Sequence, residues 1–209
     1  QTTDPAKYVE AIHACNDLIA EALLAGLPAL DVLDIGGGFP VSYGEDVMPI
    51  EEFCAPIRAA LAKVPAHVRI IAEPGRFIAA PAAIAVATVM GRAKRDGRWW
   101  YYLDDGLYGS YSGQLFDHAK YPVAALRREG KLYPSVLAGP TCDSIDVVDD
   151  TIELPELEIG DLIVGRMMGA YTWASATDFN FFKRARVVVM NERPDAQRIV
   201  RLQRKSVGR

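Results

Sequence analysis

The chain lacks several features that would assign it to a common class of protein. Its 209 residues include only three cysteines, too few for a disulfide framework, which favours a reducing compartment. Basic residues number 23 against 27 acidic ones, so no excess of positive charge is available for nucleic-acid phosphates. No apolar run reaches the roughly 18–20 residues of a membrane span. The three histidines, His13, His67 and His118, lack metal-ligand spacing. We therefore expect no nucleic-acid partner, no membrane partner and no metal site.

Two features at the ends of the chain concern location and partners. No signal peptide is visible, and the first residue is Gln1 rather than Met. We expect a cytoplasmic protein. A basic tail alternates with apolar residues and is predicted to be a solvated strand or tail; it comprises Arg198, Arg201, Arg204, Lys205 and Arg209.

The first part of the chain alternates predicted helices and strands. Residues 3–26 indicate a helix, because apolar residues recur at spacings of three and four: Ile12, Cys15, Ile19 and Leu23. A compact apolar strand is predicted at 30–35, a second helix at 50–64 and a second short strand at 68–72. This order is typical of a parallel α/β structure. Two such units cannot close a (β/α)8 barrel, which needs eight strands and about 250 residues, so we expect the last units of a larger barrel.

The pattern changes after residue 82. Short segments rich in β-branched and aromatic residues follow, separated by Gly-containing turns: 99–103, 135–138, 161–164 and 186–190. We therefore predict two domains, the C-terminal part of an α/β barrel at 1–82 and an antiparallel β-sandwich or barrel at 83–209.

Two motifs follow the predicted barrel strands. Gly36, Gly37 and Gly38 come after the first strand, and their N–H groups can face a phosphate, although taken alone they are better explained by a tight turn. Glu73 and Arg76, in the segment Glu-Pro-Gly-Arg, come after the second. A carboxylate can keep a pyridine nitrogen protonated, and an Arg can bind phosphate in a bidentate way. A surface ion pair at a strand end is the alternative.

The chain resembles the ornithine decarboxylase family of pyridoxal-phosphate-dependent enzymes, which share the alanine-racemase fold. The resemblance rests on the barrel motifs LDIGGGFP and AEPGR, and it covers nearly all of residues 1–190. Three later stretches match more narrowly: YYLDDGLYGSYSGQLFDHAKYP, GPTCDSIDVV and MMGAYTWASATDFNFF. The Gly-Pro-Thr-Cys-Asp and Phe-Asp-His segments are most similar to enzymes acting on ornithine or lysine.

This resemblance implies roles for ten residues. The phosphate of pyridoxal 5'-phosphate would be held by Gly36, Gly37, Gly38, Arg76 and Tyr171. Glu73 would face the pyridine nitrogen. The distal ammonium of the substrate would be held by Asp117 and Asp143, and Phe179 would line its pocket. Cys142 would protonate the α-carbon after carbon dioxide leaves. Each site would lie between the two subunits of a homodimer, with the loop of Cys142 and Asp143 given to the neighbour's site.

The family also needs a cofactor-bearing lysine in an early barrel strand, and no lysine here has a matching context. We therefore expect a chain that begins within the barrel and is inactive in isolation. The expected reaction of the whole protein is decarboxylation of L-ornithine, and also of L-lysine, to putrescine or its homologue for polyamine biosynthesis. Two alternatives stay open: a diaminopimelate or arginine decarboxylase of the same fold, and an inactive homologue that regulates a partner by binding it.

Overall fold

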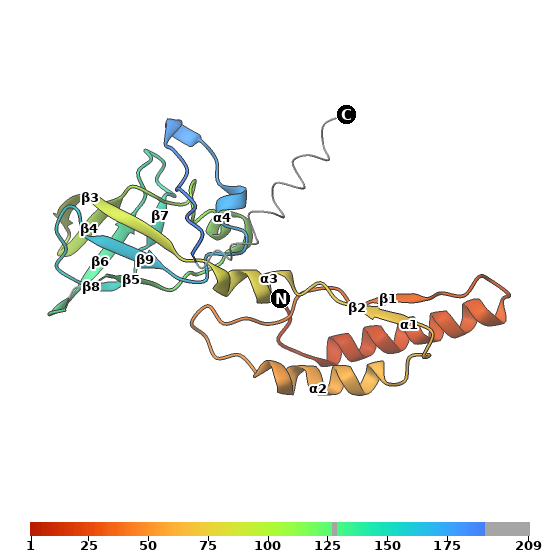
Figure 1. Cartoon of the computed structure of the whole chain (residues 1–209). Helices are drawn as coiled ribbons and strands as arrows, with labels where there is room; N and C mark the ends of the chain where they lie inside the picture. The colour runs from red at the N-terminus through yellow and green to blue at the C-terminus, as the bar shows by residue number, and fades with distance from the viewer. Residues whose placement is uncertain (127–128, 191–209) are drawn as a thin grey trace, which may run out of the picture.

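The computed structural model describes residues 1–126 and 129–190 (Figure 1). The basic tail from Arg198 to Arg209 lies outside these residues. Within the part described, no helix combines the length and apolar character needed to cross a membrane.

The N-terminal part consists of two helices beside a small parallel sheet. The helices are α1 (Ala6–Leu24) and α2 (Ile50–Leu61), and the strands are β1 (Val32–Asp34) and β2 (Arg69–Ile71). All four elements were predicted, and they are up to three residues shorter at each end than predicted. Gly26 follows α1 with φ +71°, a left-handed conformation that suits Gly and ends a helix.

Burial of aromatic side chains holds the two helices together. Tyr8 and Phe39 have ring centroids 5.2 Å apart, and Phe53 meets Tyr8 edge to face at 5.7 Å. Ile12 and Ile57 complete this buried group. Both outer edges of the sheet are unpaired, because β1 and β2 pair only with each other within the described residues. Val32, Ile70 and Ile71 are consequently 37–41% exposed, which is unusual for apolar barrel strands.

Short helices lead from this part into a larger sheet (Figure 1). After α3 (Gly75–Ala79) and the 3-10 turn η1 (Ala80–Ala82) the chain enters β3 (Ala85–Arg95). The boundary predicted at residue 82 falls at this transition and stays a prediction.

The large sheet has seven strands in the order β5-β9-β3-β4-β6-β7, with β8 beside β6. After β3 its strands are β4 (Arg98–Leu103), β5 (Val123–Ala125), β6 (Leu132–Ala138), β7 (Val147–Asp149), β8 (Glu153–Pro155) and β9 (Leu162–Gly165). The short helix α4 (Gly113–Asp117) and the turns η2 (Trp173–Ser175) and η3 (Phe179–Phe181) lie in its connections. Alternate residues of β3 face a core centred on Tyr101, Leu103 and Tyr111.

Two details of the sheet correct the sequence prediction. The pair β4–β6 is parallel, so the sheet is mixed rather than wholly antiparallel. Residues 104–131 connect these two strands, a connection long enough for the crossover that parallel pairing requires. The prediction of a strand at 186–190 is wrong, because these residues form no β-ladder with another strand. Val187, Val188 and Val189 are 63–64% exposed, because no neighbouring strand in the described residues pairs with them.

Candidate functional site

The ends of the two barrel strands bring the glycines beside Glu73. Glu73 N donates a hydrogen bond of 2.9 Å to Gly36 O. Gly37 lies so close that a Cβ there would stand 2.4 Å from Glu73 O, so only Gly fits at this position. Tyr8 from α1 donates to Gly37 O at 2.5 Å and fixes the loop from the other side. The parallel pairing of β1 with β2 therefore joins two motifs that are 35 residues apart in sequence.

The glycine loop has the backbone form of an anion site. Gly36 and Gly38 have φ of +73° and +87°, while Gly37 between them has no positive φ. Such alternation turns successive N–H groups toward one point. The N–H of Gly36 is already used by Asp34 Oδ1 at 2.8 Å. Those of Gly37 and Gly38 have no acceptor among the described residues, and they can therefore donate to a phosphate.

Arg76 contacts three side chains from distant parts of the chain. Its guanidinium forms an ion pair with Asp117 at the end of α4 and donates to the Tyr43 hydroxyl at 3.2 Å. The same group lies over the Tyr171 ring, 4.6 Å from its centre. Tyr171 itself has φ +54°, a conformation that is uncommon for an aromatic residue. The structure thus unites Arg76 and Tyr171, as a shared phosphate site requires. It also pairs Arg76 with Asp117, a contact that the sequence did not predict.

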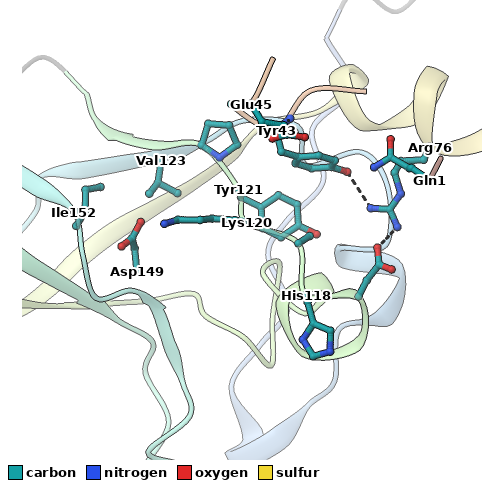
Figure 2. A pocket seen from close by; sticks show the side chains of 14 residues that line it. Gln1, Tyr43, Glu45, Arg76, His118, Lys120, Tyr121, Val123, Asp149 and Ile152 are labelled. Carbon is teal, nitrogen blue, oxygen red and sulfur yellow. Dashed lines mark hydrogen bonds and ion pairs between the residues drawn. The ribbon is translucent and has the colours of Figure 1, made fainter. Parts of the chain in front are cut away.

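Arg76, Asp117 and Tyr43 line a cavity of about 790 Å³, whereas Tyr171 is not part of its lining. Figure 2 shows the hydrogen bonds of Arg76 at one end and the Lys120 side chain extending toward Asp149 at the other. Tyr121 lies between them, and burial raises its pKa to about 12, so it stays a neutral hydroxyl. Sequence reasoning missed Tyr43, Lys120 and Tyr121. Tyr121 lies in residues 101–122, a segment that resembles the family, but its position in the sequence does not indicate that it faces a cavity.

A second group of predicted residues lies in the loop after β6. Cys142 is exposed, and the Asn180 amide donates a hydrogen bond of 3.3 Å to its sulfur. Tyr108 donates a hydrogen bond of 2.5 Å to Asp143 Oδ2, and its ring lies 4.4 Å from that of Phe179. This bond lowers the pKa of Asp143 and, with the nearby negative charge, raises the pKa of Tyr108 to about 12. Sequence reasoning did not single out Tyr108 or Asn180.

The two groups do not share one cavity within the described residues. Cys142 and Asp143 are absent from the lining of the cavity that contains Arg76 and Asp117. Glu73 is also outside this lining, and its carboxylate is exposed beside the glycine loop. The ten residues predicted for one site thus fall into three groups on a single chain: the glycine loop with Glu73, the Arg76 group, and the group around Cys142 and Asp143. This is the arrangement expected if a site takes residues from each of two subunits.

The glycine loop and the Arg76 group together have the donors and the positive charge that the phosphate end of pyridoxal 5'-phosphate needs. A phosphate dianion needs several N–H or O–H donors and a cation. The free N–H groups of Gly37 and Gly38, the Arg76 guanidinium and the Tyr171 hydroxyl supply both kinds of group. Arg76 would exchange part of its contact with Asp117 for this ligand. In the described residues, no three potential metal ligands from His, Cys, Asp or Glu cluster together.

Comparison with known proteins gives one consistent family. The family described as pyridoxal-dependent decarboxylase, C-terminal sheet domain, matches residues 14–169. A lysine/ornithine decarboxylase of Selenomonas ruminantium is 36% identical over 196 residues, which cover 93% of this chain and 49% of the relative. An ornithine decarboxylase of Mus musculus is 34% identical over 222 residues, with 96% and 48% covered. The chain spans about half the length of the curated relatives it matches.

Solved structures agree with the expected fold class. The crystal structure of a lysine/ornithine decarboxylase from Vibrio vulnificus, complexed with putrescine, has 60% identity and a TM-score of 0.88. The match covers 91% of this chain and 52% of that one. The arginine decarboxylase of Paramecium bursaria Chlorella virus, bound to agmatine, has 33% identity and a TM-score of 0.78, with 87% and 49% covered.

Proposed function

Because the chain belongs to the pyridoxal-dependent decarboxylase family, we propose that its protein decarboxylates L-ornithine, and also L-lysine, to the diamine. The observation that carries the choice of substrate is the acidic character of both residues expected at its far end, Asp117 and Asp143. Burying a terminal ammonium requires an anionic partner, and two carboxylates provide it. The putrescine bound by the Vibrio relative is a diamine of this kind.

The cofactor would be held by its phosphate and its ring nitrogen. Gly37 and Gly38 would donate their N–H groups to the phosphate, Arg76 would supply the positive charge, and Tyr171 would add a hydroxyl. Glu73, which follows β2, would accept a hydrogen bond from the protonated pyridine nitrogen. Bound in this way, pyridoxal phosphate supplies an electron sink for the pair of electrons left on the α-carbon when carbon dioxide departs.

Asp117 has a cationic partner within its own chain, which bears on its role. Arg76 neutralises it, so the carboxylate does not stand alone beside the cavity. A phosphate that draws the guanidinium away would leave Asp117 free to accept a substrate ammonium. The substrate ammonium would then take the place of Arg76 as the cationic partner of Asp117.

Cys142 would deliver the proton that completes the reaction. Its thiol hydrogen moves to the α-carbon, which by then carries the electron pair of the broken bond to carbon dioxide. Asp143, next to it, would hold the distal ammonium from the other side of the subunit boundary. Because these two residues lie away from the Arg76 cavity of their own chain, we propose a homodimer in which each subunit lends them to its neighbour.

The substrate is tested by assaying the protein as its cell makes it, with every segment or subunit that accompanies this sequence. Ornithine and lysine differ by one methylene, worth only ~1–3 kcal/mol of discrimination. We expect ornithine to be used at least as well as lysine, and meso-diaminopimelate hardly at all. Diaminopimelate ends in a second carboxylate, which Asp117 and Asp143 would repel. Efficient turnover of diaminopimelate would overturn the assignment of both residues.

Arginine is the second candidate substrate, favoured by the likeness to the viral arginine decarboxylase. Its guanidinium also needs anionic partners, so charge alone does not separate it from ornithine. The same assay separates them, since arginine yields agmatine rather than putrescine. Retention of the expected site residues makes an inactive regulatory homologue the weaker alternative.

We also propose a cytoplasmic location, supported by three cysteines that form no disulfide in the structure.

A further inference from the structure

One buried carboxylate lies behind the loop of Cys142 without touching any of the residues assigned above. Asp146 is 2% exposed and has no ion-pair partner among the described residues. Its Oδ1 accepts a hydrogen bond of 2.8 Å from Leu107 N. Its Oδ2 accepts two from Thr141, of 3.0 Å from N and 2.7 Å from Oγ1. Donors rather than a cation therefore stabilise this buried charge.

The chain makes room for this carboxylate with two glycines. A Cβ added to Gly106 would stand 2.3 Å from Asp146 Oδ1, and one added to Gly139 would stand 2.1 Å from the same atom. Gly139 N also donates to Asp146 O at 2.8 Å. Any side chain at either position would displace the carboxylate. The two glycines and the aspartate therefore form one structural unit.

This unit joins the two loops that carry the second group of site residues. One loop, residues 105–108, ends in Tyr108, and Asp146 holds it through Leu107 N. The other, residues 139–143, contains Cys142 and Asp143, and Asp146 holds it through Thr141. Thr141 Oγ1 in turn accepts from Asp143 N at 3.4 Å, and Asp146 N donates to Asp143 O at 3.1 Å. Thr141, before Cys142, is thus bonded to the Asp146 carboxylate, and Asp143, after it, is bonded to Thr141 and to the Asp146 backbone.

We propose that Asp146 is the positioning residue of the reactive loop, which sets where the Cys142 thiol and the Asp143 carboxylate stand at the neighbouring subunit's site. The proposal rests on the proposed function for the roles of Cys142 and Asp143. Beyond those roles, the proposal states that delivery of the Cys142 proton to the correct carbon depends on the Asp146 carboxylate, which does not touch the substrate. A proton donor displaced by a fraction of an ångström loses its advantage over competing acceptors, because proton transfer demands hydrogen-bond distance.

The substitution Asp146→Asn removes the charge and keeps the volume. An amide has one acceptor oxygen and one NH₂ group. In either orientation of the Asn side chain, the NH₂ group therefore faces donors, which are Leu107 N or the two donors of Thr141. Thr141→Val removes only the hydroxyl donor and is the milder change; Thr141→Ser restores that donor. Asp150→Asn is the matched control, because Asp150 is exposed and its side chain has no partner in the described residues.

Hydrogen exchange of the backbone tests the structural half without any activity. We expect Asp146→Asn to cause a loss of protection confined to peptides covering residues 105–110 and 139–146. Thr141→Val should act on the second peptide alone, and Thr141→Ser and Asp150→Asn should leave both as in the wild type. Unchanged exchange in Asp146→Asn would overturn the proposal. If Asp146→Asn does not fold, Thr141→Val and Thr141→Ser decide the question.

The ratio of products tests the catalytic half in the active protein. Protonation of the cofactor's carbon instead of the α-carbon, followed by hydrolysis with water, gives an aldehyde and the amine form of the cofactor. Cys142→Ala should raise the ratio of aldehyde to diamine and serves as the reference. We expect Asp146→Asn to raise it roughly tenfold to hundredfold, the scale that a small misplacement costs. Thr141→Val should raise it less, and Thr141→Ser should restore it.

The two measurements distinguish the failure of each idea. Loss of loop protection together with an unchanged product ratio would overturn the positioning role and leave the proposed function standing. Failure of the wild-type protein to form any diamine would overturn the proposed function, while hydrogen exchange still reports on Asp146. A merely structural role would lower both products in proportion, so a lower rate at a constant ratio also contradicts the proposal.

Discussion

At the scale of single residues, the hydrogen bond from Tyr108 lowers the pKa of Asp143. The Tyr108 hydroxyl bond is the largest cause of the lowered pKa of Asp143, followed by a bond from Ile145 N. A group with a lowered pKa in the folded state contributes stability at neutral pH and loses it as the pH falls through that pKa. Any contribution of Asp143 to the stability of the fold is therefore lost only in acid, at pH values below the ordinary pKa range of Asp.

We predict that Tyr108→Phe raises the pKa of Asp143 back toward its ordinary value. An NMR titration of the Asp143 carboxyl carbon measures this directly. Tyr133→Phe is the control, since the Tyr133 ring contacts Lys131 and lies away from Asp143. An unchanged Asp143 pKa in Tyr108→Phe would show that the short bond is unimportant in solution.

Glu73 offers a second prediction at this scale. Glu73→Ala removes the anion proposed to keep the pyridine nitrogen protonated, while the backbone bond between Glu73 N and Gly36 O remains. Decarboxylation by the active protein should slow by a factor of ~10²–10³, the scale reported for one preorganised electrostatic contact. The KM for ornithine should change much less. A normal turnover number would mean that Glu73 has only a structural role.

At the scale of elements, close backbone contacts place the cavity. Gly169, after β9, lies against α3, and a Cβ there would stand 1.7 Å from Ala79 O. Gly169 N also donates to Ala80 O at 3.1 Å. This contact fixes Tyr171, two residues further on, relative to Arg76 on α3. The phosphate side of the site therefore depends on how the large sheet packs against the end of the barrel segment.

We predict that Gly169→Ala destabilises the fold by at least about 1–3 kcal/mol, the usual cost of overpacking. Urea unfolding of the purified protein measures the change. Gly75→Ala is the matched control, because a Cβ at Gly75 meets nothing within 4 Å and Gly75 begins α3. Equal stability of the two variants would indicate that α3 shifts readily to accommodate the methyl group.

At the scale of the whole molecule, the division of the site into separate groups has a consequence for assembly. Glu73 belongs to the barrel segment and Cys142 to a loop of the large sheet, and the two do not line a common cavity in the described residues. If two subunits exchange these groups, a single substitution in each subunit need not destroy both sites of a dimer.

We predict that the active protein sediments as a homodimer. Mixing equal amounts of Glu73→Ala and Cys142→Ala proteins, under conditions that exchange subunits, should restore about a quarter of the wild-type activity. Random pairing gives one half heterodimers, each with one intact site of two. The separate variants, dissociated and reassembled alone, are the controls. An active monomer, or no recovery on mixing, would refute the shared site.

The amino-acid sequence by itself determined the elements whose patterns are local. The spacing of apolar residues in α1 and α2, and the short apolar strands β1 and β2, could be predicted because each is a property of neighbouring residues. The motif of residues 139–143 and the segment Glu-Pro-Gly-Arg also indicated the family, because their residue types are specific. Cys142 and Asp143 could be named from this resemblance alone, although their roles stay proposals.

Tertiary structure decided what depends on partners far away in the sequence. Val187, Val188 and Val189 have strand-forming side chains but no strand to pair with in the described residues. The parallel pairing of β4 with β6 depends on a long crossover, which no local pattern encodes. Arg76 and Asp117, which form an ion pair, are 41 positions apart in sequence. Asp146 and Leu107, whose hydrogen bond links two loops, are 39 positions apart. Such contacts arise only when the whole chain has folded, since burial and hydrogen bonding then select the partner.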